Sequence, residues 1–227
     1  MDTAILPQGA LAMYLREKFL QALIHSQPVQ LYHKGHCLYG ADEPFRGLFV
    51  VVSGAVKHYR LTEEGEEPIT GFCLPGEWCG LPDLSSGRYL GFAQALDTCS
   101  VCRFPQTLLA DVLAEPHGRQ EMYTLMSTVI RENKGRYYQI SKARADVRFV
   151  MFILDLSRRF SRYGDYSREF HLPMTRGDIA NYLGLTPETI SREITRLGQC
   201  DLIHFNNRFI TIRSPAKLEA WYCRGVK

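Results

Sequence analysis

The sequence predicts an α+β protein with an N-terminal antiparallel β-roll, a long helix and a C-terminal winged helix-turn-helix. Three observations carry this prediction. Short β-rich runs alternate with turn signals between residues 29 and 104, and apolar residues recur at helical spacing from 116 to 142. Two short helices with cap signals then precede a hairpin after residue 174. We place the domains at 1–28 (helical arm), 29–112 (β-roll sensor), 113–144 (dimerisation helix) and 145–227 (winged helix-turn-helix).

Composition limits the classes of protein that fit. The 227 residues are 45% hydrophobic and 22% charged, as in an ordinary globular protein. No apolar run is long enough to cross a membrane, and residues 1–10 lack a secretory pattern. The seven cysteines are scattered and odd in number, so we expect a reducing, cytoplasmic compartment without disulfides. An acidic turn at 63–67 and a basic stretch over 134–213 indicate a nucleic-acid-binding half joined to a separate sensor half.

The elements before the long helix are a short helix and a β-roll. Residues 11–25 show apolar residues at helical spacing, and Pro28 ends that pattern. The β-roll follows because several short strands at regular spacing are typical of a closed or sandwiched antiparallel sheet. The predicted strands lie in the runs 48–54, 55–61, 69–74, 89–96 and 100–104.

The long helix carries a heptad-like seam. Its members, at spacings of four and three, are Met122, Met126, Val129, Asn133, Arg136 and Ile140. Such a seam favours a partner helix, and a single polar Asn fixes the register of a two-fold pair. The sequence therefore predicts a homodimer, with a helix packed on its own domain as the alternative. A further amphipathic helix is predicted over 146–161.

Cap residues define the helix-turn-helix. Thr175 caps the first helix, Asp178 reaches back to its N-terminus, and Gly184 supplies the left-handed residue that ends it. Thr186 caps the second helix, and Pro187 takes its first position. The alternation of LIHF and RFITI around Asn206-Asn207 predicts a tight hairpin, the wing.

The second of these helices is predicted to read DNA bases. Its polar side holds Glu188, Thr189, Ser191, Arg192, Thr195 and Arg196, opposite Ile190, Ile194 and Leu197. Arg192 can bind guanine O6 and N7, and Glu188 can accept from cytosine N4. Pro187 belongs to the same N-terminal turn, and Arg176 and Arg208 are expected to contact phosphates. The alternative is a Glu–Arg pair on a solvated surface.

The chain resembles the cyclic-AMP receptor protein/FNR family, on its FNR branch. The matching segments are ITGF (69–72), PGEWCGL (75–81), GFAQAL (91–96), VCRFP (101–105), LSRRF (156–160) and MTRGDIANYLGLTPETISR (174–192). The resemblance implies a cyclic-nucleotide-binding-like β-roll, a dimerisation helix and a winged helix. It also implies a regulator, an activator or a repressor, that works with RNA polymerase and whose Glu188, Ser191 and Arg192 read a TTGAT-like half-site.

Two departures from the family pattern indicate that this chain binds neither the iron–sulfur cluster of the FNR-type sensors nor the cyclic nucleotide of the cyclic-AMP binders. The branch's oxygen sensors hold an iron–sulfur cluster with several N-terminal cysteines and one in the β-roll. Here only Cys102 matches, and residues 1–36 contain no cysteine. The Arg-Ser that takes a cyclic phosphate is replaced by Tyr89-Leu90, beside Arg88. The sensors also carry an acidic residue where Asn133 stands. We therefore expect no cofactor or metal, and DNA binding in air.

Other candidate sites receive structural interpretations. Cys99 and Cys102 are predicted to be buried structural thiols, and His33, His36 and Cys37 are assigned to an alternating strand. An assembly of Cys37, Cys73, Cys79 and Cys102 around a cluster, or haem on non-standard ligands, would make an oxygen or redox sensor; this alternative stays open. Nothing in the sequence indicates a catalytic constellation, so an enzyme and a pure interaction module are the competing classes. Base-specific, salt-sensitive DNA binding separates both from a regulator.

Overall fold

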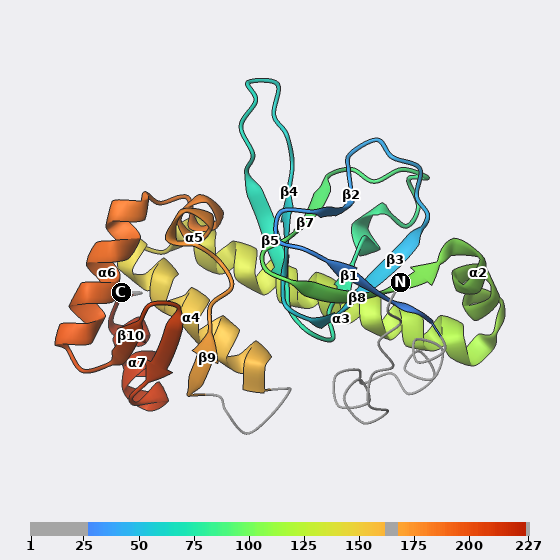
Figure 1. Cartoon of the computed structure of the whole chain (residues 1–227). Coiled ribbons are helices and arrows are strands. Elements are labelled where there is room, and N and C mark those ends of the chain that lie inside the picture. The colour runs from blue at the N-terminus through green and yellow to red at the C-terminus, as the bar shows by residue number, and fades with distance from the viewer. Residues whose placement is uncertain (1–26, 162–167, 226–227) are drawn as a thin grey trace. The chain divides into compact units, whose positions relative to one another are not determined.

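The computed structural model describes residues 27–161 and 168–225, except the side chains of 135–142 and 222–225 (Figure 1). The chain divides into two compact units between Arg131 and Glu132, and each is described by itself. The predicted helix over 11–25 and the expected turn at 163–165 lie outside the described residues.

The first unit contains two antiparallel sheets. Their strand orders are β1-β8-β3-β6 and β2-β7-β4-β5 (Figure 1). The strands are β1 (Val29–Tyr32), β2 (Cys37–Tyr39), β3 (Gly47–Ser53), β4 (Val56–Tyr59), β5 (Ile69–Cys73), β6 (Trp78–Cys79), β7 (Phe92–Ala95) and β8 (Cys99–Pro105), with a 3-10 turn, η1 (Leu81–Asp83). This arrangement confirms the predicted β-roll.

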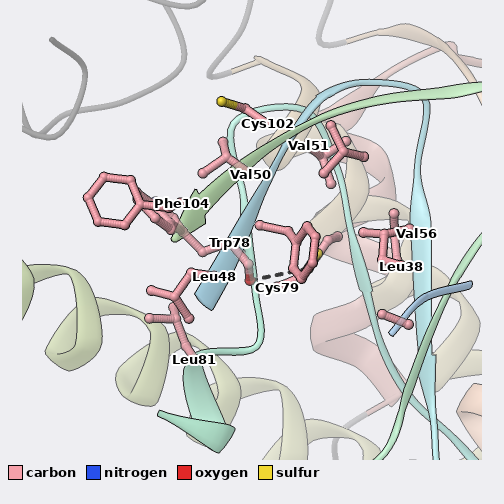
Figure 2. Close-up of a cluster of buried hydrophobic side chains, with 14 of the residues drawn as sticks. Leu38, Leu48, Val50, Val51, Val56, Trp78, Cys79, Leu81, Cys102 and Phe104 are labelled. Atoms are coloured by element: carbon pink, nitrogen blue, oxygen red, sulfur yellow. Dashed lines mark hydrogen bonds between the residues drawn. The ribbon is translucent and has the colours of Figure 1, made fainter. Parts of the chain in front are cut away.

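Strand β3 runs through the middle of the first unit's core. It pairs with β8 on one side and β6 on the other, and Leu48, Val50 and Val51 are fully enclosed. Figure 2 shows these side chains with Phe104 of β8 and Cys79 of β6. A central strand covered on both faces needs a continuous apolar run rather than an alternating one, which explains the sequence LFVVV.

Two helices follow the sheets, α2 (Gln106–Ala114) and α3 (Pro116–Lys142). The bounds of α3 match the predicted long helix. However, Met122 is fully buried in the core of its own β-roll, and Met126 and Val129 pack against that core. For this part of α3 the contacts favour the alternative interpretation, a helix packed on its own domain. Met122 is fully enclosed and therefore cannot contact a partner helix.

The exposed side of α3 is a different stripe. Tyr123 and Ile130, seven residues apart, keep 56% and 55% of their surface accessible, and Asn133 is exposed one turn further along. The side chains of Arg136 and Ile140 lie outside the described residues. An apolar stripe at heptad spacing is the pattern expected of a helix that packs against a partner helix.

The second unit is helical with a small sheet. It contains α4 (Ala145–Ser161), β9 (Glu169–His171), α5 (Arg176–Leu183), α6 (Pro187–Gln199), β10 (Ile203–Asn206), β11 (Phe209–Ile212) and α7 (Pro215–Gly225). The sheet order is β10-β11-β9. Phe149, Ile153 and Leu156 of α4 are fully enclosed in this unit. Sequence patterns predicted α4, α5, α6 and the hairpin, but not α2, β9 or α7.

None of the helices in the described parts of the chain combines the length and the apolar character needed to span a membrane.

Candidate nucleic-acid interface

The first helix of the helix-turn-helix begins and ends where its cap residues predict. Thr175 Oγ1 accepts a hydrogen bond from Asp178 N at 3.0 Å, and the Asp178 carboxylate accepts from Thr175 N at 2.9 Å. Gly184 ends α5 with a φ of 63°. The Arg148 guanidinium of α4 donates to the carbonyl of Leu183 at 3.1 Å, which ties this end of α5 to α4. These contacts confirm the predicted capping box and fix the turn between the two helices.

The second helix, α6, is oriented by its buried face. Thr186 Oγ1 accepts from Thr189 N at 3.3 Å, and Pro187 takes the first helical position. Ile190 and Leu197 are fully buried, and Ile194 nearly so. Because a helix has only one face opposite such a stripe, Glu188, Arg192 and Thr195 are left exposed.

The two predicted base-reading side chains are both exposed at the N-terminal half of α6. The Glu188 carboxylate accepts hydrogen bonds from its own backbone N–H and from the Thr186 hydroxyl, and these bonds lower its pKa. Both partners of these bonds belong to the N-terminal end of α6, which is the end predicted to meet base edges. Arg192 extends from the same face one turn later.

Arg176 joins the two helices and the wing. Its guanidinium donates to Ser191 Oγ at 3.1 Å and lies 5.9 Å from the ring centroid of Phe205 on β10. Ser191 Oγ in turn donates to the carbonyl of Pro187 at 2.9 Å. Ser191 thus connects an exposed arginine to the first turn of α6, which suits it to positioning that arginine.

The wing is the β10–β11 hairpin. Asn206 pairs with Phe209, so the turn residues are Asn207 and Arg208, one position later than the predicted Asn206-Asn207. Asn207 has a φ of 54°, the left-handed conformation that Asn tolerates. Arg208 is partly buried and donates to the carbonyl of Pro173 at 3.4 Å. This contact holds the wing turn to the segment just before α5.

Arg196 departs from the prediction. It was expected on the polar side of α6, but its guanidinium lies 2.7 Å from a Glu193 carboxylate oxygen and 3.2 Å from one of Asp146 on α4. Glu193 is buried, and the ring of Trp221 lies 5.3 Å from the guanidinium. Although desolvation by burial raises the pKa of Asp146, hydrogen bonds from Arg196 and the Val147 backbone and the charge of Arg144 lower it overall. Arg196 is therefore partly buried in an ion-pair network of the second unit and is not a free cation on the polar side of α6.

The described cysteines of the β-roll do not bring together the four thiolates that an iron–sulfur cluster needs. Cys102 is 2% exposed, its sulfur faces the carbonyl of Gln27 at 3.9 Å, and burial raises its pKa to about 11. Cys99 on the same strand is fully buried, so the predicted burial of both thiols is confirmed. Within the described residues, the side chains that lie close enough together to share a metal ion are one histidine and two cysteines, and Cys102 is not one of them. A cluster needs four thiolates, so the described residues do not fit one.

The cyclic-nucleotide position is also altered. The Arg88 guanidinium donates to the carbonyl of Asp42 at 2.8 Å. Tyr89 is 1% exposed, and its hydroxyl donates to the carbonyl of Gly47 at 2.8 Å. Tyr89, which the resemblance aligns with the phosphate-binding arginine, is thus a core residue, and Tyr89 and Arg88 do not offer the cation and hydroxyl that a cyclic phosphate needs.

His33 and His36 are exposed and flank a β-turn rather than alternating along one strand. His36 N donates to the carbonyl of His33 at 3.0 Å, and their rings meet edge-on at 5.8 Å. Exposed Cys37 begins β2 directly afterwards. The predicted strand alternation was wrong here because Lys34-Gly35 forms the turn.

Comparisons with known proteins agree with this architecture. The Crp-like helix-turn-helix domain family matches residues 147–221, and the cyclic nucleotide-binding domain family matches residues 29–115. The fumarate and nitrate reduction regulatory protein of Salmonella typhi is 42% identical over 86% of this chain and 77% of its own length. The protein of the same name from Vibrio cholerae is 40% identical over 87% and 78%.

A solved structure gives the same result at the level of the fold. FixK2 from Bradyrhizobium japonicum superposes with a TM-score of 0.76 at 29% identity, covering 85% of this chain and 95% of FixK2. The two family models match segments within the β-roll unit and the winged-helix unit. The chain therefore belongs to the CRP/FNR family of DNA-binding transcription regulators.

Proposed function

We propose that this protein is a homodimer that reads a two-fold-symmetric DNA site with TTGAT-like half-sites, spaced about one helical turn apart. The carrying observation is the exposure of Glu188 and Arg192 at the N-terminal half of α6, whose opposite face is buried. Arg192 donates two hydrogen bonds to a guanine, and Glu188 accepts one from a cytosine. Pro187, Thr189 and Ser191 complete the first turns of the reading helix.

Arg176 and Arg208 are assigned to phosphate contacts. Arg176 is exposed at the first position of α5, and Arg208 is in the wing turn. Contacts to phosphates hold a protein in register on the duplex without carrying sequence information. Arg176 also donates to Ser191, so it links the phosphate contact to the reading helix.

The homodimer is assigned to the exposed stripe of α3. Tyr123 and Ile130 are its apolar members, partly buried Met126 lies between them, and Asn133 follows. Compared with the seam predicted from sequence, this stripe leaves out Met122, which is buried in the β-roll core. Arg136 and Ile140 remain predicted members of the interface. Asn133 is neutral, so two copies can face each other across a two-fold axis without charge repulsion.

Regulation proceeds in this proposal without an iron–sulfur cluster or a cyclic nucleotide. Two observations support this. Cys102, the cysteine that matches the cluster position, is enclosed in the β-roll. At the cyclic-phosphate position Tyr89 lies in the core, and the neighbouring Arg88 donates to the carbonyl of Asp42. Control then lies in the abundance of the protein or in another ligand of the β-roll. Family membership makes RNA polymerase the expected partner of a DNA-bound activator.

The test is equilibrium binding of Arg192→Ala to a TTGAT-containing palindrome and to random DNA of equal length. We expect a loss of roughly 1–3 kcal/mol on the palindrome and almost none on random DNA. Arg60→Ala, which removes an exposed arginine from the β-roll unit, is the matched control and should bind both DNAs as the wild type does. Equal losses on both DNAs would reduce Arg192 to a phosphate contact.

A further inference from the structure

Three metal-binding side chains from three different strands lie together inside the β-roll. They are His58 of β4, Cys73 at the end of β5 and Cys79 at the end of β6. One ligand atom from each lies within 4.8 Å of the other two, and His58 Nε2 is 3.1 Å from Cys73 Sγ. Cys79 has no exposed surface, and Cys73 is 8% exposed. Figure 2 shows Cys79 among the apolar side chains of the core.

The strand pairing explains why these residues meet. On β4 and β5, Val56 pairs with Cys73 and His58 pairs with Gly71, so His58 and Cys73 are diagonal neighbours. Cys79 belongs to the other sheet, where it pairs with Phe49 of β3. The Pro75-Gly76 turn carries the chain across, held by a hydrogen bond from Gly76 N to the Val51 carbonyl at 2.7 Å. The three ligands therefore come from both sheets.

A neighbouring tyrosine orients the imidazole. The hydroxyl of Tyr39 lies 3.3 Å from His58 Nδ1, the ring nitrogen that faces away from the sulfur. Tyr39 is itself fixed in the core by stacking on Tyr89, with ring centroids 3.9 Å apart. Metal-binding histidines almost always have their second ring nitrogen held by such a partner. The contact leaves Nε2 directed at the two thiols.

We propose that His58 Nε2, Cys73 Sγ and Cys79 Sγ bind a zinc ion. Two thiolates and an imidazole form a soft donor set of the kind that zinc prefers. The charge also favours a divalent ion, because two buried thiolates and Zn²⁺ sum to zero, whereas a monovalent ion leaves a net charge in the core. Binding displaces to solvent the protons that the thiols carry.

A zinc ion here would join the two sheets of the β-roll. Three protein ligands leave one coordination position for water or another small donor. The proposal departs from the expectation that no residue of this chain holds a metal. It does not depend on the proposed DNA function, because the donors lie in the β-roll unit and not in the winged helix.

The first experiment titrates the reduced, chelator-treated full chain with Zn²⁺ against a chromophoric chelator, and with Co²⁺ as a spectroscopic probe. We expect one tight equivalent of zinc, and for Co²⁺ the intense near-ultraviolet absorption of thiolate ligation with tetrahedral visible bands. Absence of a stoichiometric zinc site, or a Co²⁺ spectrum with oxygen and nitrogen ligands only, would overturn the proposal.

Variants then assign the ligands. Cys73→Ser, Cys79→Ala and His58→Gln should each weaken zinc binding by at least about tenfold, and Tyr39→Phe should do so by roughly 10–100-fold through the lost orientation of the imidazole. Cys99→Ala and Cys102→Ala remove buried thiols of β8 outside the cluster and should bind zinc as the wild type does. Unchanged zinc binding in the first three variants would contradict the assignment. If a ligand variant does not fold, the wild-type Co²⁺ spectrum and the β8 controls still decide the outcome.

Discussion

The two units of this protein place their reactive groups in opposite ways. The winged helix displays Glu188 and Arg192 on an exposed face and holds its other α6 charges, buried Glu193 and partly buried Arg196, in a network with Asp146. The β-roll does the reverse, since its cysteines Cys73 and Cys79 are buried beside His58. The difference is one of access: the α6 side chains can contact a macromolecule, whereas the ligand atoms of Cys73 and Cys79 can be reached only by something small enough to enter the core.

The interior network of the winged helix gives the largest expected effect. Arg196→Ala removes the cation from buried Glu193 and should destabilise the second unit by about 2–3 kcal/mol, below the usual range for a buried pair because Arg196 is 37% exposed. The measurement is urea unfolding followed by far-ultraviolet circular dichroism. Arg192→Ala, one turn earlier and exposed, should stay within about 0.5 kcal/mol of the wild type. Equal stability losses would remove the distinction between the two arginines.

Two glycines of the first helix should respond with opposite signs. Gly184 has a φ of 63°, so Gly184→Ala should cost roughly 1–2 kcal/mol. At helical Gly177 an added Cβ would meet only Thr175 Oγ1 at 3.6 Å, an ordinary contact, so Gly177→Ala should stabilise by about 0.5–1 kcal/mol. Thermal unfolding of both variants checks the signs. Destabilisation by Gly177→Ala would show that the start of α5 is not the regular helix described.

The helix-turn-helix was predictable from sequence down to its single cap residues, whereas for the β-roll the sequence predicted the architecture but not the side-chain contacts inside it. Thr175, Asp178 and Gly184 act within a few residues of their own positions, so local patterns suffice to assign them. Whether Arg196 faces DNA depends on Asp146 of another helix, and the sequence of α6 alone contains no sign of that contact.

The long helix and the metal-ligand cluster show the same limit. Heptad spacing placed Met122 in a dimer seam, but the side of α3 that faces the β-roll is chosen by the shape of that core. His58, Cys73 and Cys79 meet only through strand pairing and a turn between sheets, so their spacing in sequence could not predict a shared site.

The dimer should be moderately sensitive to charge at Asn133. Asn133→Asp would place two carboxylates close together across the proposed seam and should weaken the dimer by roughly 1 kcal/mol, about fivefold. Asn133→Ala removes the amide without adding charge and should have a smaller effect. Sedimentation equilibrium in air, on iron-free protein, measures both. A wild type that is monomeric in air and dimerises only after anaerobic loading with iron and sulfide would contradict the cluster-free proposal.

Phosphate contacts should give the smallest effects. Arg176→Ala or Arg208→Ala should reduce the slope of log affinity against log salt by about one unit, while leaving the preferred sequence unchanged. Arg60→Ala supplies the control for a change in total charge alone. An unchanged slope would exclude the substituted arginine from the phosphate contacts.

The most direct test of the account is the sequence preference of the aerobically purified chain, selected from random duplex DNA and compared with that of Arg192→Ala. We predict a two-fold-symmetric motif with TTGAT-like half-sites for the wild type. The variant should lose discrimination at one base pair in each half-site and keep it elsewhere. An asymmetric motif, or an Arg192→Ala motif identical to that of the wild type, would contradict the claim that a dimer reads DNA through the exposed face of α6.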